Sequence, residues 1–536
     1  MTALRVSLAV AVGFAVVVGA AGTFAQASGF DDKPTGFLTE KTGGMPADAW
    51  ADTRLGTAKR LVSALPAAPR SRALRDLQFS VMVSLLKPPV ADGSPPPTLF
   101  ARKVDRMAAM GEGESLNEVV RDAGAYGDPP IATIVTNAMM MAGEAAGACA
   151  VAENHTLTPQ SFAQRAEATC MLVRGDTGGA LGTLGALRAI DPSFANLVQA
   201  VAEGSSKAVV PVGTFDGPAM LLYRLGRLVP PASLLSTTQP PMIRALVGQR
   251  GLPMATRIEI AERGEALAII EATRLADLYM EALREGASLP PAMAKRAQLV
   301  ASARNAANPT EIMNAVRAVY TEAKGSPLFP TIARATASTL LNLPPKPEYA
   351  GVAQEAIRGF LLLGDKRLTR AWTQLALQAA FNNKEAENAL DRQMPLVEIA
   401  GIDGGRNLVP EDVNRWYAVV RQDDARAAPL RGNLLLELFR AVGFELPPRS
   451  TDLPEAPPAG VRLVMPPAAT LQALQAAGTA HREAEAALLA SDAIGETPLA
   501  ELHPAAVGTI VRALRQAGEP QAARLFAIET AIAYGL

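Results

Sequence analysis

Few side chains in this sequence have the types and spacing that catalysis or metal binding requires. The chain holds three histidines, His155, His481 and His503, and none has another histidine or a cysteine at the spacing of a metal site. The neighbouring carboxylates Asp423 and Asp424 have the types needed for an acid–base pair, but in a loop or at a helix start they are expected to be solubilising caps. We therefore expect no zinc site, no cofactor and no catalytic residue among these groups.

Two short fragments match motifs of penicillin-binding enzymes, in which a lysine assists a nucleophilic serine. Ser84 and Lys87 have the Ser-x-x-Lys spacing, and residues 41–43 read Lys-Thr-Gly. The Lys-Thr-Gly fragment precedes the serine instead of following it, and no Ser-Asp-Asn equivalent accompanies them. The Gly-x-Ser-x-Gly motif of esterases and the lysine-containing phosphate loop are also absent from the sequence. We interpret the match as coincidence and expect a protein that is not an enzyme.

The composition predicts a helical protein. Of the 536 residues 49% are hydrophobic but only 5% are aromatic, and most of the apolar residues are Ala, Leu and Val. Ala and Leu favour helices, and the 41 prolines and 43 glycines cluster between the apolar segments, as between many short helices. The formal net charge is -1 without a long run of Lys or Arg, so we do not expect nucleic acid as a partner.

The N-terminus has the pattern of an export signal. A short start containing Arg5 is followed by an apolar stretch that ends in Ala25-Gln26-Ala27, the small-x-small pattern of a signal peptidase site. We predict a Sec-type signal peptide over residues 1–27 and a soluble mature protein in the periplasm. The alternative is an uncleaved inner-membrane anchor, because roughly 20 apolar residues can span a bilayer.

A glycine followed by an acidic residue recurs with a period of 32 residues. The three pairs are Gly111-Glu112, Gly143-Glu144 and Gly175-Asp176, and the residues five positions after the glycines are Leu116, Ala148 and Ala180. Glycine suits a turn that needs positive φ, and an acidic side chain can cap the following helix. A small residue on the first turn of that helix lets it approach its predecessor. The period therefore predicts repeated pairs of antiparallel helices.

The third of these units resembles a tetratricopeptide repeat. The segment "SFAQRAEATCMLVR" takes the place of the first helix, and Gly175, Asp176, Ala180, Asp191 and Pro192 fall at positions that the family's pattern specifies. The sequence departs from that pattern in three ways: the period is 32 instead of 34 residues, Ala168 and Met171 replace bulky aromatics, and Leu187 replaces a small residue. The resemblance covers about residues 98–205 and implies an all-α fold.

The whole chain also resembles uncharacterised exported Ala/Pro-rich helical-repeat proteins of alphaproteobacteria. That resemblance rests on the signal peptide, the Ala- and Cys-containing segments and the Gly-Asp turns, and it implies no activity.

The rest of the chain is divided by its prolines and glycines. Similar glycine–acid turns are expected at Gly264, Gly364 and Gly518, and helices over the segments that begin near residues 290, 308, 329 and 430. We predict an irregular α-solenoid over residues 46–445, preceded by a disordered leader over 28–45. A proline-rich extended linker over 446–468 leads to a C-terminal helical unit over 469–536 that caps the solenoid.

The two cysteines of the chain are expected to pair. Cys149 lies on the first turn of one predicted helix and Cys170 near the last turn of the next, and these ends meet when the two helices are antiparallel. Export to an oxidising compartment permits a disulfide. The alternative is two buried thiols that pack as small hydrophobic groups.

The function expected from these patterns is binding without catalysis. Helical solenoids present a long surface to other proteins, which favours a periplasmic scaffold, assembly factor or adaptor that binds other envelope proteins. More specific alternatives are an accessory of the flagellar motor or of a secretion apparatus, and an inner-membrane-anchored interaction protein. A helical glycan-active or hydrolytic enzyme is the remaining alternative.

Overall fold

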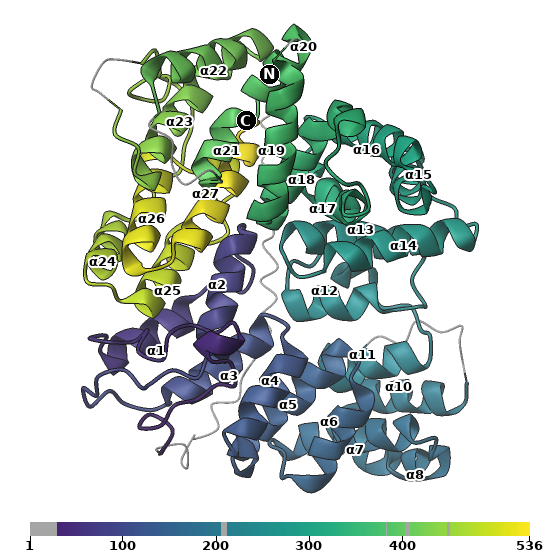
Figure 1. Cartoon of the computed structure of the whole chain (residues 1–536). Coiled ribbons are helices and arrows are strands. Elements are labelled where there is room, and N and C mark those ends of the chain that lie inside the picture. The colour runs from purple at the N-terminus through teal and green to yellow at the C-terminus, as the bar shows by residue number, and fades with distance from the viewer. Residues whose placement is uncertain (1–28, 205–211, 382, 403–407, 447–450) are drawn as a thin grey trace, which may run out of the picture.

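The computed structural model describes residues 29–204, 212–381, 383–402, 408–446 and 451–536 (Figure 1). Within these ranges the chain forms 27 α-helices and short 3-10 helices, and β-pairing is limited to isolated bridges. The prediction of an all-α protein is thus confirmed. The predicted signal peptide, residues 1–27, lies outside the described residues and stays a prediction. None of the described helices has the length and apolarity needed to cross a membrane.

The first ten helices are α1 (Leu55–Ala64), α2 (Arg72–Val83), α3 (Leu99–Ala109), α4 (Gly113–Asp122), α5 (Pro129–Ala142), α6 (Ala145–Asn154), α7 (Gln160–Val173), α8 (Thr177–Gly182), α9 (Leu184–Ile190) and α10 (Pro192–Ala202). The middle of the chain holds α11 (Gly217–Leu225), α12 (Pro240–Val247), α13 (Met254–Ala266), α14 (Ala272–Arg284), α15 (Pro291–Asn305), α16 (Pro309–Ala323), α17 (Phe329–Leu340) and α18 (Ala353–Leu363). The last helices are α19 (Lys366–Ala380), α20 (Lys384–Asp391), α21 (Met394–Ala400), α22 (Pro410–Asp423), α23 (Ala428–Val442), α24 (Ala468–Thr479), α25 (Glu483–Ile494), α26 (Pro504–Ala517) and α27 (Pro520–Ala533).

The three glycines of the 32-residue period form the same turn between paired helices. Gly111, Gly143 and Gly175 have φ values of 79°, 89° and 80°, in the left-handed region that favours glycine. After each glycine, the acidic residue donates its backbone N–H to a methionine carbonyl five residues back, at 2.9–3.0 Å. This is the Schellman bond that ends a helix. Gly364 and Gly518 share this φ region and bond, so the turn recurs outside the 32-residue register.

The acidic side chains after these glycines do not all cap the next helix. Asp176 accepts a hydrogen bond from the backbone N–H of Gly179 at 2.8 Å, as a capping residue should. Glu112 and Glu144 make no such bond at the starts of α4 and α6. Glu112 instead forms ion pairs with Arg75 and Arg244, from α2 and α12. The side chain of Glu112 thus reaches neighbouring helices, whereas that of Asp176 caps its own helix.

One expected turn is wrong. Gly264 lies inside α13 and is not a helix end. A Cβ atom at this glycine would lie 2.6 Å from Ile270 Cγ1 and 2.7 Å from Ile243 Cγ2. Glycine is therefore required here by the close approach of neighbouring chain segments, which a local Gly-Glu pattern does not reveal.

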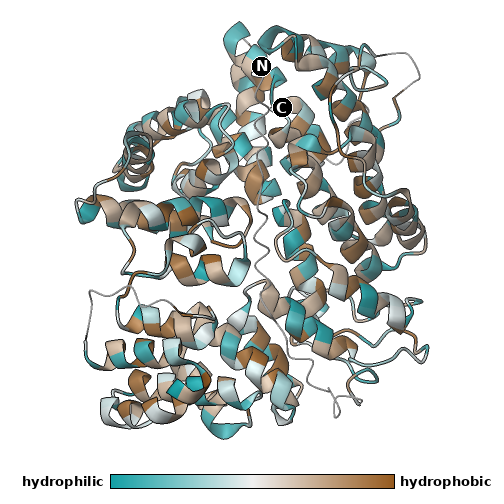
Figure 2. Ribbon diagram, turned by 180° about the vertical axis from the view of Figure 1, so that it is seen from behind, coloured by the Kyte–Doolittle hydropathy of each residue, from teal (hydrophilic) through white to brown (hydrophobic). Residues whose placement is uncertain are grey.

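The helices do not contact only their neighbours along the chain. After α10 the chain returns, and α11 packs against α5 and α7 while α12 packs against α5 and α3. From α12 to α19 each helix packs against the next, although α17 also reaches back to α13 and α14. Apolar residues lie mostly where helices face one another, with polar residues on the outer surfaces (Figure 2). Trp372 of α19 has no exposed surface.

The two ends of the chain pack together. α25 and α27 contact α2, and α25 also contacts α1, so the purple N-terminal and yellow C-terminal helices lie side by side (Figure 1). Across this junction, Thr53 donates a hydrogen bond to Glu485 at 3.0 Å and Ser71 donates one to Glu529 at 2.6 Å. α26 packs on α23, which joins the last four helices to the preceding ones. The C-terminal unit, α24 to α27, therefore contacts both the N-terminal helices α1 and α2 and the preceding helix α23.

The expectation of a disordered leader over residues 28–45 is wrong for its described part, 29–45. Asp31 forms an ion pair with the buried Lys59 at 2.8 Å and accepts the backbone N–H of Leu99, at the start of α3, at 2.7 Å. Phe30 stacks on Phe100 with ring centroids 4.8 Å apart. Burial of these charged and aromatic groups fixes the segment, although its composition looks like that of a linker.

The proline-rich segment between α23 and α24 is non-helical in its described part, as expected of a linker, but it packs against the protein. Leu453 is buried, and the carbonyl of Pro454 accepts a hydrogen bond from Asn433 of α23 at 3.0 Å. Val464 forms an isolated bridge with Leu502.

The two cysteines lie at disulfide-bonding distance. Cys149 of α6 and Cys170 of α7 have Cα atoms 5.5 Å apart and both side chains are buried. Because α6 and α7 pack against each other, the pair joins two consecutive helix pairs of the 32-residue register.

Removing this bridge should destabilise the protein. The cysteines are 21 residues apart, and cross-linking a loop of that length stabilises a fold by about 3 kcal/mol through the lost entropy of the unfolded chain. We expect the Cys149→Ser/Cys170→Ser variant to unfold at a correspondingly lower urea concentration, measured by circular dichroism. Thiol labelling of the unreduced wild-type protein should find no free cysteine; two free thiols would contradict the bridge.

A pair of carboxyl groups near the chain-end junction should make stability depend on pH. Burial and the nearby Glu483 raise the pKa of Glu519, at the start of α27, from 4.5 to about 7. Burial and the charges of Asp48 and Glu40 also raise the pKa of Glu483. A raised carboxyl pKa means that the folded state keeps a proton which the unfolded chain loses, so stability is lost as pH rises from 4.5 through 7.

We expect Glu519→Gln to be more stable than the wild type at pH 8, by about 2 kcal/mol once partial exposure is allowed for, and nearly equal to it at pH 5. Urea unfolding at several pH values measures this difference. Glu348→Gln, on an exposed glutamate, is the matched control and should leave the pH profile unchanged. A constant difference across pH would rule out titration of Glu519 as the cause.

Candidate functional site

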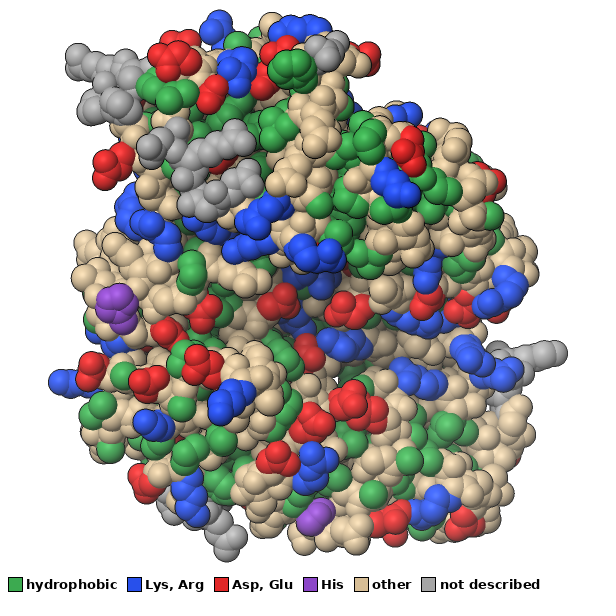
Figure 3. Space-filling model, in the orientation of Figure 1, with side chains coloured by type: hydrophobic (Ala, Val, Ile, Leu, Met, Phe, Trp, Pro, Cys, Tyr) green, Lys and Arg blue, Asp and Glu red, His purple; other side chains and the backbone are tan. Residues whose placement is uncertain are grey.

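An arginine-lined cavity lies between α11, α12, α13 and α14. Its volume is about 970 Å³, and six arginines and two glutamates contribute to its walls. The lining residues are Arg224, Leu225, Arg227, Gly248, Arg250, Arg257, Arg274, Glu281, Arg284 and Glu285. Charged side chains form a belt across the middle of the molecule, on the face shown in Figure 3. With six positive and two negative groups, the lining carries a formal charge of +4 in a chain whose net charge is -1.

Helix ends supply most of these arginines. Arg224 and Arg284 lie in the last turns of α11 and α14, and Arg227 and Arg250 follow shortly after α11 and α12. Basic side chains suit these positions because the last carbonyls of a helix carry partial negative charge. The return of α11 and α12 onto α5 then brings helix ends from different parts of the sequence to one place.

Two of the arginines hold the walls together. Arg224 donates hydrogen bonds to the carbonyls of Ala142, the last residue of α5, at 3.1 Å and of Ala245 at 3.4 Å. Arg257 donates to the last carbonyl of α12, Val247, at 3.1 Å and forms an ion pair with Glu281 at 3.3 Å. Burial lowers the pKa of Arg224, although a guanidinium remains charged at neutral pH. Arg224 and Arg257 thus connect neighbouring helices and stabilise the fold.

One glycine of the 32-residue register makes room for Arg224. A Cβ atom at Gly143 would overlap the Arg224 guanidinium, and one at Gly248 would lie 2.5 Å from its Nη2. The turn at Gly143, which was predicted from local conformation, therefore also packs against Arg224, a residue of the cavity wall. The other predicted turn residues position helices elsewhere: Ala180 is fully buried, and Pro192 is the first residue of α10.

Four arginines of the cavity differ from the first two. Arg227, Arg250, Arg274 and Arg284 are exposed, and within the described part of the chain none of them forms an ion pair or a side-chain hydrogen bond. Other arginines in this protein are used to cap neighbouring helices: Arg75, Arg431, Arg515 and Arg524 donate to carbonyls at the ends of α3, α27, α23 and α21. The unpaired guanidiniums of the cavity have no such structural use.

The chemistry available in this cavity is recognition of anions. Guanidinium groups present several N–H donors in a plane that matches carboxylates and phosphates, and they do not exchange protons near neutral pH. Walls of one charge sign also raise the local concentration of oppositely charged ligands. The two glutamates offset only part of this field, because Glu281 is already bound by Arg257 and Glu285 is one negative charge against four unpaired arginines.

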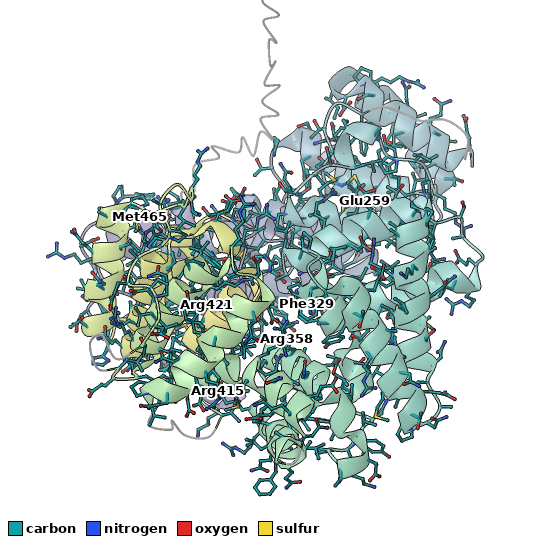
Figure 4. All side chains as sticks on the ribbon, turned by 90° about the horizontal axis from the view of Figure 1, so that it is seen from above. Glu259, Phe329, Arg358, Arg415, Arg421 and Met465 are labelled. Atoms are coloured by element: carbon teal, nitrogen blue, oxygen red, sulfur yellow. A yellow bond between two sulfur atoms is a disulfide. The ribbon has the colours of Figure 1, made fainter. Side chains whose placement is uncertain are left out.

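One arginine that packs on an aromatic ring lies outside this cavity. Arg358 of α18 lies over the ring of Phe329, at the start of α17, with 5.6 Å between the guanidinium carbon and the ring centroid (Figure 4). It donates a hydrogen bond to Gln393 at 2.9 Å, and burial lowers its pKa. These contacts join α17, α18 and the start of α21, so we assign this arginine to packing.

The residues that were considered for catalysis have structural contacts. The Ser84 hydroxyl is buried, donates to the carbonyl of Ser80 at 2.6 Å and accepts the N–H of Met45 at 2.8 Å. His155 stacks on Tyr126, with ring centroids 4.7 Å apart, and His503 caps α26. Among the described residues, no group of three or more His, Cys, Asp or Glu side chains is arranged to hold a metal ion.

Interpretation of the sequence missed the cavity. The sequence holds no long run of Lys or Arg, and the arginines of the cavity are spread from residue 224 to residue 284. The available signal was weaker: Arg224, Arg227, Arg250 and Arg284 each lie within two residues of a glycine that can end a helix. Comparison of the chain with protein-family models, curated proteins and solved structures gives no significant match in any of the three.

Proposed function

We propose that this chain is a non-catalytic scaffold or adaptor of the bacterial periplasm that binds another envelope protein through an anionic group held in the arginine-lined cavity. The observation that carries the proposal is the set of four exposed, unpaired guanidiniums on the walls of one cavity of about 970 Å³. Unpaired like charges repel one another, so placing them together is unfavourable in the free protein. An anionic ligand offsets that repulsion.

The helical architecture suits such a role. We propose that the helix pairs around Gly111, Gly143 and Gly175 are tetratricopeptide-like units of an irregular α-solenoid, supported by the shared turn geometry and the 32-residue spacing. Solenoids of this kind present broad surfaces to other proteins. The return of α11 and α12 onto α5 creates the cavity on such a surface.

The proposed compartment rests on two features. The N-terminal sequence has the pattern of a cleaved signal peptide, and a cysteine pair at disulfide-bonding distance is compatible with an oxidising compartment. N-terminal sequencing of the mature protein tests this part of the proposal. A start at Ser28 is expected, whereas an intact N-terminus in the membrane fraction would favour the anchored alternative.

The binding function is tested by photo-crosslinking in intact cells. A photoreactive amino acid at position 250, on the cavity wall, should capture a discrete protein partner, and the same group at the exposed position 367 of α19 should not. Capture should be lost when Arg274 and Arg284 are replaced by glutamine in the same chain. The adaptor function is overturned if position 250 captures no reproducible partner, or if capture is unchanged by these substitutions.

A further inference from the structure

The four unpaired arginines are distributed along the cavity. Arg274 and Arg284 are ten residues apart on α14, which corresponds to about 15 Å along a helix axis. Arg227 and Arg250 approach from other walls, after the ends of α11 and α12. A single phosphate or carboxylate cannot contact groups spread over such a length. A ligand that uses all four must itself be extended and carry several separated negative charges.

The charge pattern along α14 also selects among anions. Arg274, Glu281 and Glu285 are separated by seven and four residues, close to whole helical turns, and therefore share one face of the helix. A compact polyphosphate placed on this face would meet the two glutamates as well as the arginine. A peptide offers both carboxylates for the arginines and backbone N–H groups for glutamate oxygens.

The dimensions agree with a short peptide. An extended chain rises by about 3.3 Å per residue, so roughly five residues match the 15 Å between Arg274 and Arg284. The volume of about 970 Å³ is at the upper end of the 300–1,000 Å³ range that is usual for ligand pockets. The exposed arginine side chains must become ordered on binding, which limits affinity and makes binding sensitive to salt.

We propose that the arginine-lined cavity binds an extended acidic peptide segment of the partner protein, about five residues long, with its carboxylates distributed along α14. This inference rests on the proposed adaptor function and specifies the chemical class of its ligand. Arg224 and Arg257 fix the walls, while Arg227, Arg250, Arg274 and Arg284 contact the peptide.

Fluorescence anisotropy with the full mature chain tests this inference. The probe is a fluorescein-labelled pentaglutamate peptide, with a labelled pentaglutamine peptide as the uncharged control and inorganic pyrophosphate as a compact competitor. We expect saturable binding of pentaglutamate that weakens as salt is raised, no saturable binding of pentaglutamine, and displacement only at pyrophosphate concentrations well above those of unlabelled pentaglutamate.

Matched variants locate the binding. Arg274→Gln/Arg284→Gln should weaken pentaglutamate binding by about tenfold to a hundredfold, because two charge-assisted contacts are lost. Arg367→Gln/Arg462→Gln removes two exposed arginines outside the cavity, so the net charge changes equally and affinity should change less than twofold. Circular dichroism should show that both variants are folded.

Four outcomes would overturn the inference: no saturable binding of pentaglutamate, equal weakening by both pairs of substitutions, binding of pentaglutamine as tight as that of pentaglutamate, or tighter competition by pyrophosphate than by the acidic peptide. Tighter pyrophosphate binding that is lost in Arg274→Gln/Arg284→Gln would identify a phosphate site in the same cavity. The cellular crosslinking experiment is scored independently, so a captured partner with no peptide binding would retain the adaptor function and reject only the acidic-peptide ligand.

Discussion

Replacing Glu265 by glutamine should lower the free energy of unfolding by about 3–5 kcal/mol, the range measured when one partner of a buried ion pair is removed. Glu265 lies inside α13, and its side chain has no exposed surface. Its carboxylate accepts two hydrogen bonds from Arg334 of α17, at 2.6 and 2.8 Å, and a third from Arg72 of α2 at 3.2 Å. A single group thus connects an N-terminal helix to two helices in the middle of the chain.

The loss should be large because the Arg334 side chain is almost completely shielded from water. Its side chain is only 8% exposed, so without Glu265 a guanidinium charge would remain buried beside a neutral amide. Burial on its own would raise the pKa of Glu265, but the hydrogen bonds and charge of Arg334, together with the charge of Arg72, lower it below the ordinary value. A lowered carboxyl pKa contributes stability that is present above pH 4.5 and is lost as pH falls.

Urea unfolding at pH 7 measures this effect, and two variants control for it. Asp423→Asn breaks an exposed ion pair with Arg392 and should cost less than about 1 kcal/mol. Glu265→Met/Arg334→Met removes both buried charges and should be closer to the wild type than Glu265→Gln is. A double variant that is less stable than Glu265→Gln would show that an unpaired Arg334 charge is not the main cost.

The sequence predicts the features of this fold that depend on a few adjacent residues. The turns at Gly111, Gly143 and Gly175 need a glycine with positive φ and a backbone N–H on the residue that follows it, and both requirements are local. Helices such as α15 and α16 also begin and end where proline and apolar spacing indicate. The same local pattern fails at Gly264, because packing against Ile243 and Ile270 explains that glycine.

Features that depend on distant residues could not be predicted. The order of the segment around Asp31 comes from Lys59, 28 positions away, whose buried charge needs a partner. The arginine-lined cavity depends on the return of α11 and α12 to α5, so no pattern within one helix reveals it. Arg224 illustrates the difference, since it caps α5, whose last residue lies 82 positions earlier.

The contact between the chain ends predicts a second large effect. Glu529 of α27 accepts hydrogen bonds from the Ser71 hydroxyl at 2.6 Å and from the backbone N–H of Ala73 at 3.1 Å. Ser71 is the N-cap of α2, so a C-terminal side chain binds the first turn of an N-terminal helix. Glu529→Ala would leave both donors without this partner, and we expect it to lower the free energy of unfolding by about 3–4 kcal/mol.

Glu529→Gln is the matched control, because its amide oxygen can still accept one of the two hydrogen bonds and its loss should be about half as large. Hydrogen exchange distinguishes a local effect of Glu529→Ala from an effect on the packing of the two chain ends against each other. If Glu529 joins the two ends, Glu529→Ala should speed exchange in α1 and α2 as well as in α25 and α27, since these helices pack together. Faster exchange in α27 alone would mean that the N-terminal helices keep their structure without the C-terminal ones, and that their packing in the folded protein contributes little to stability.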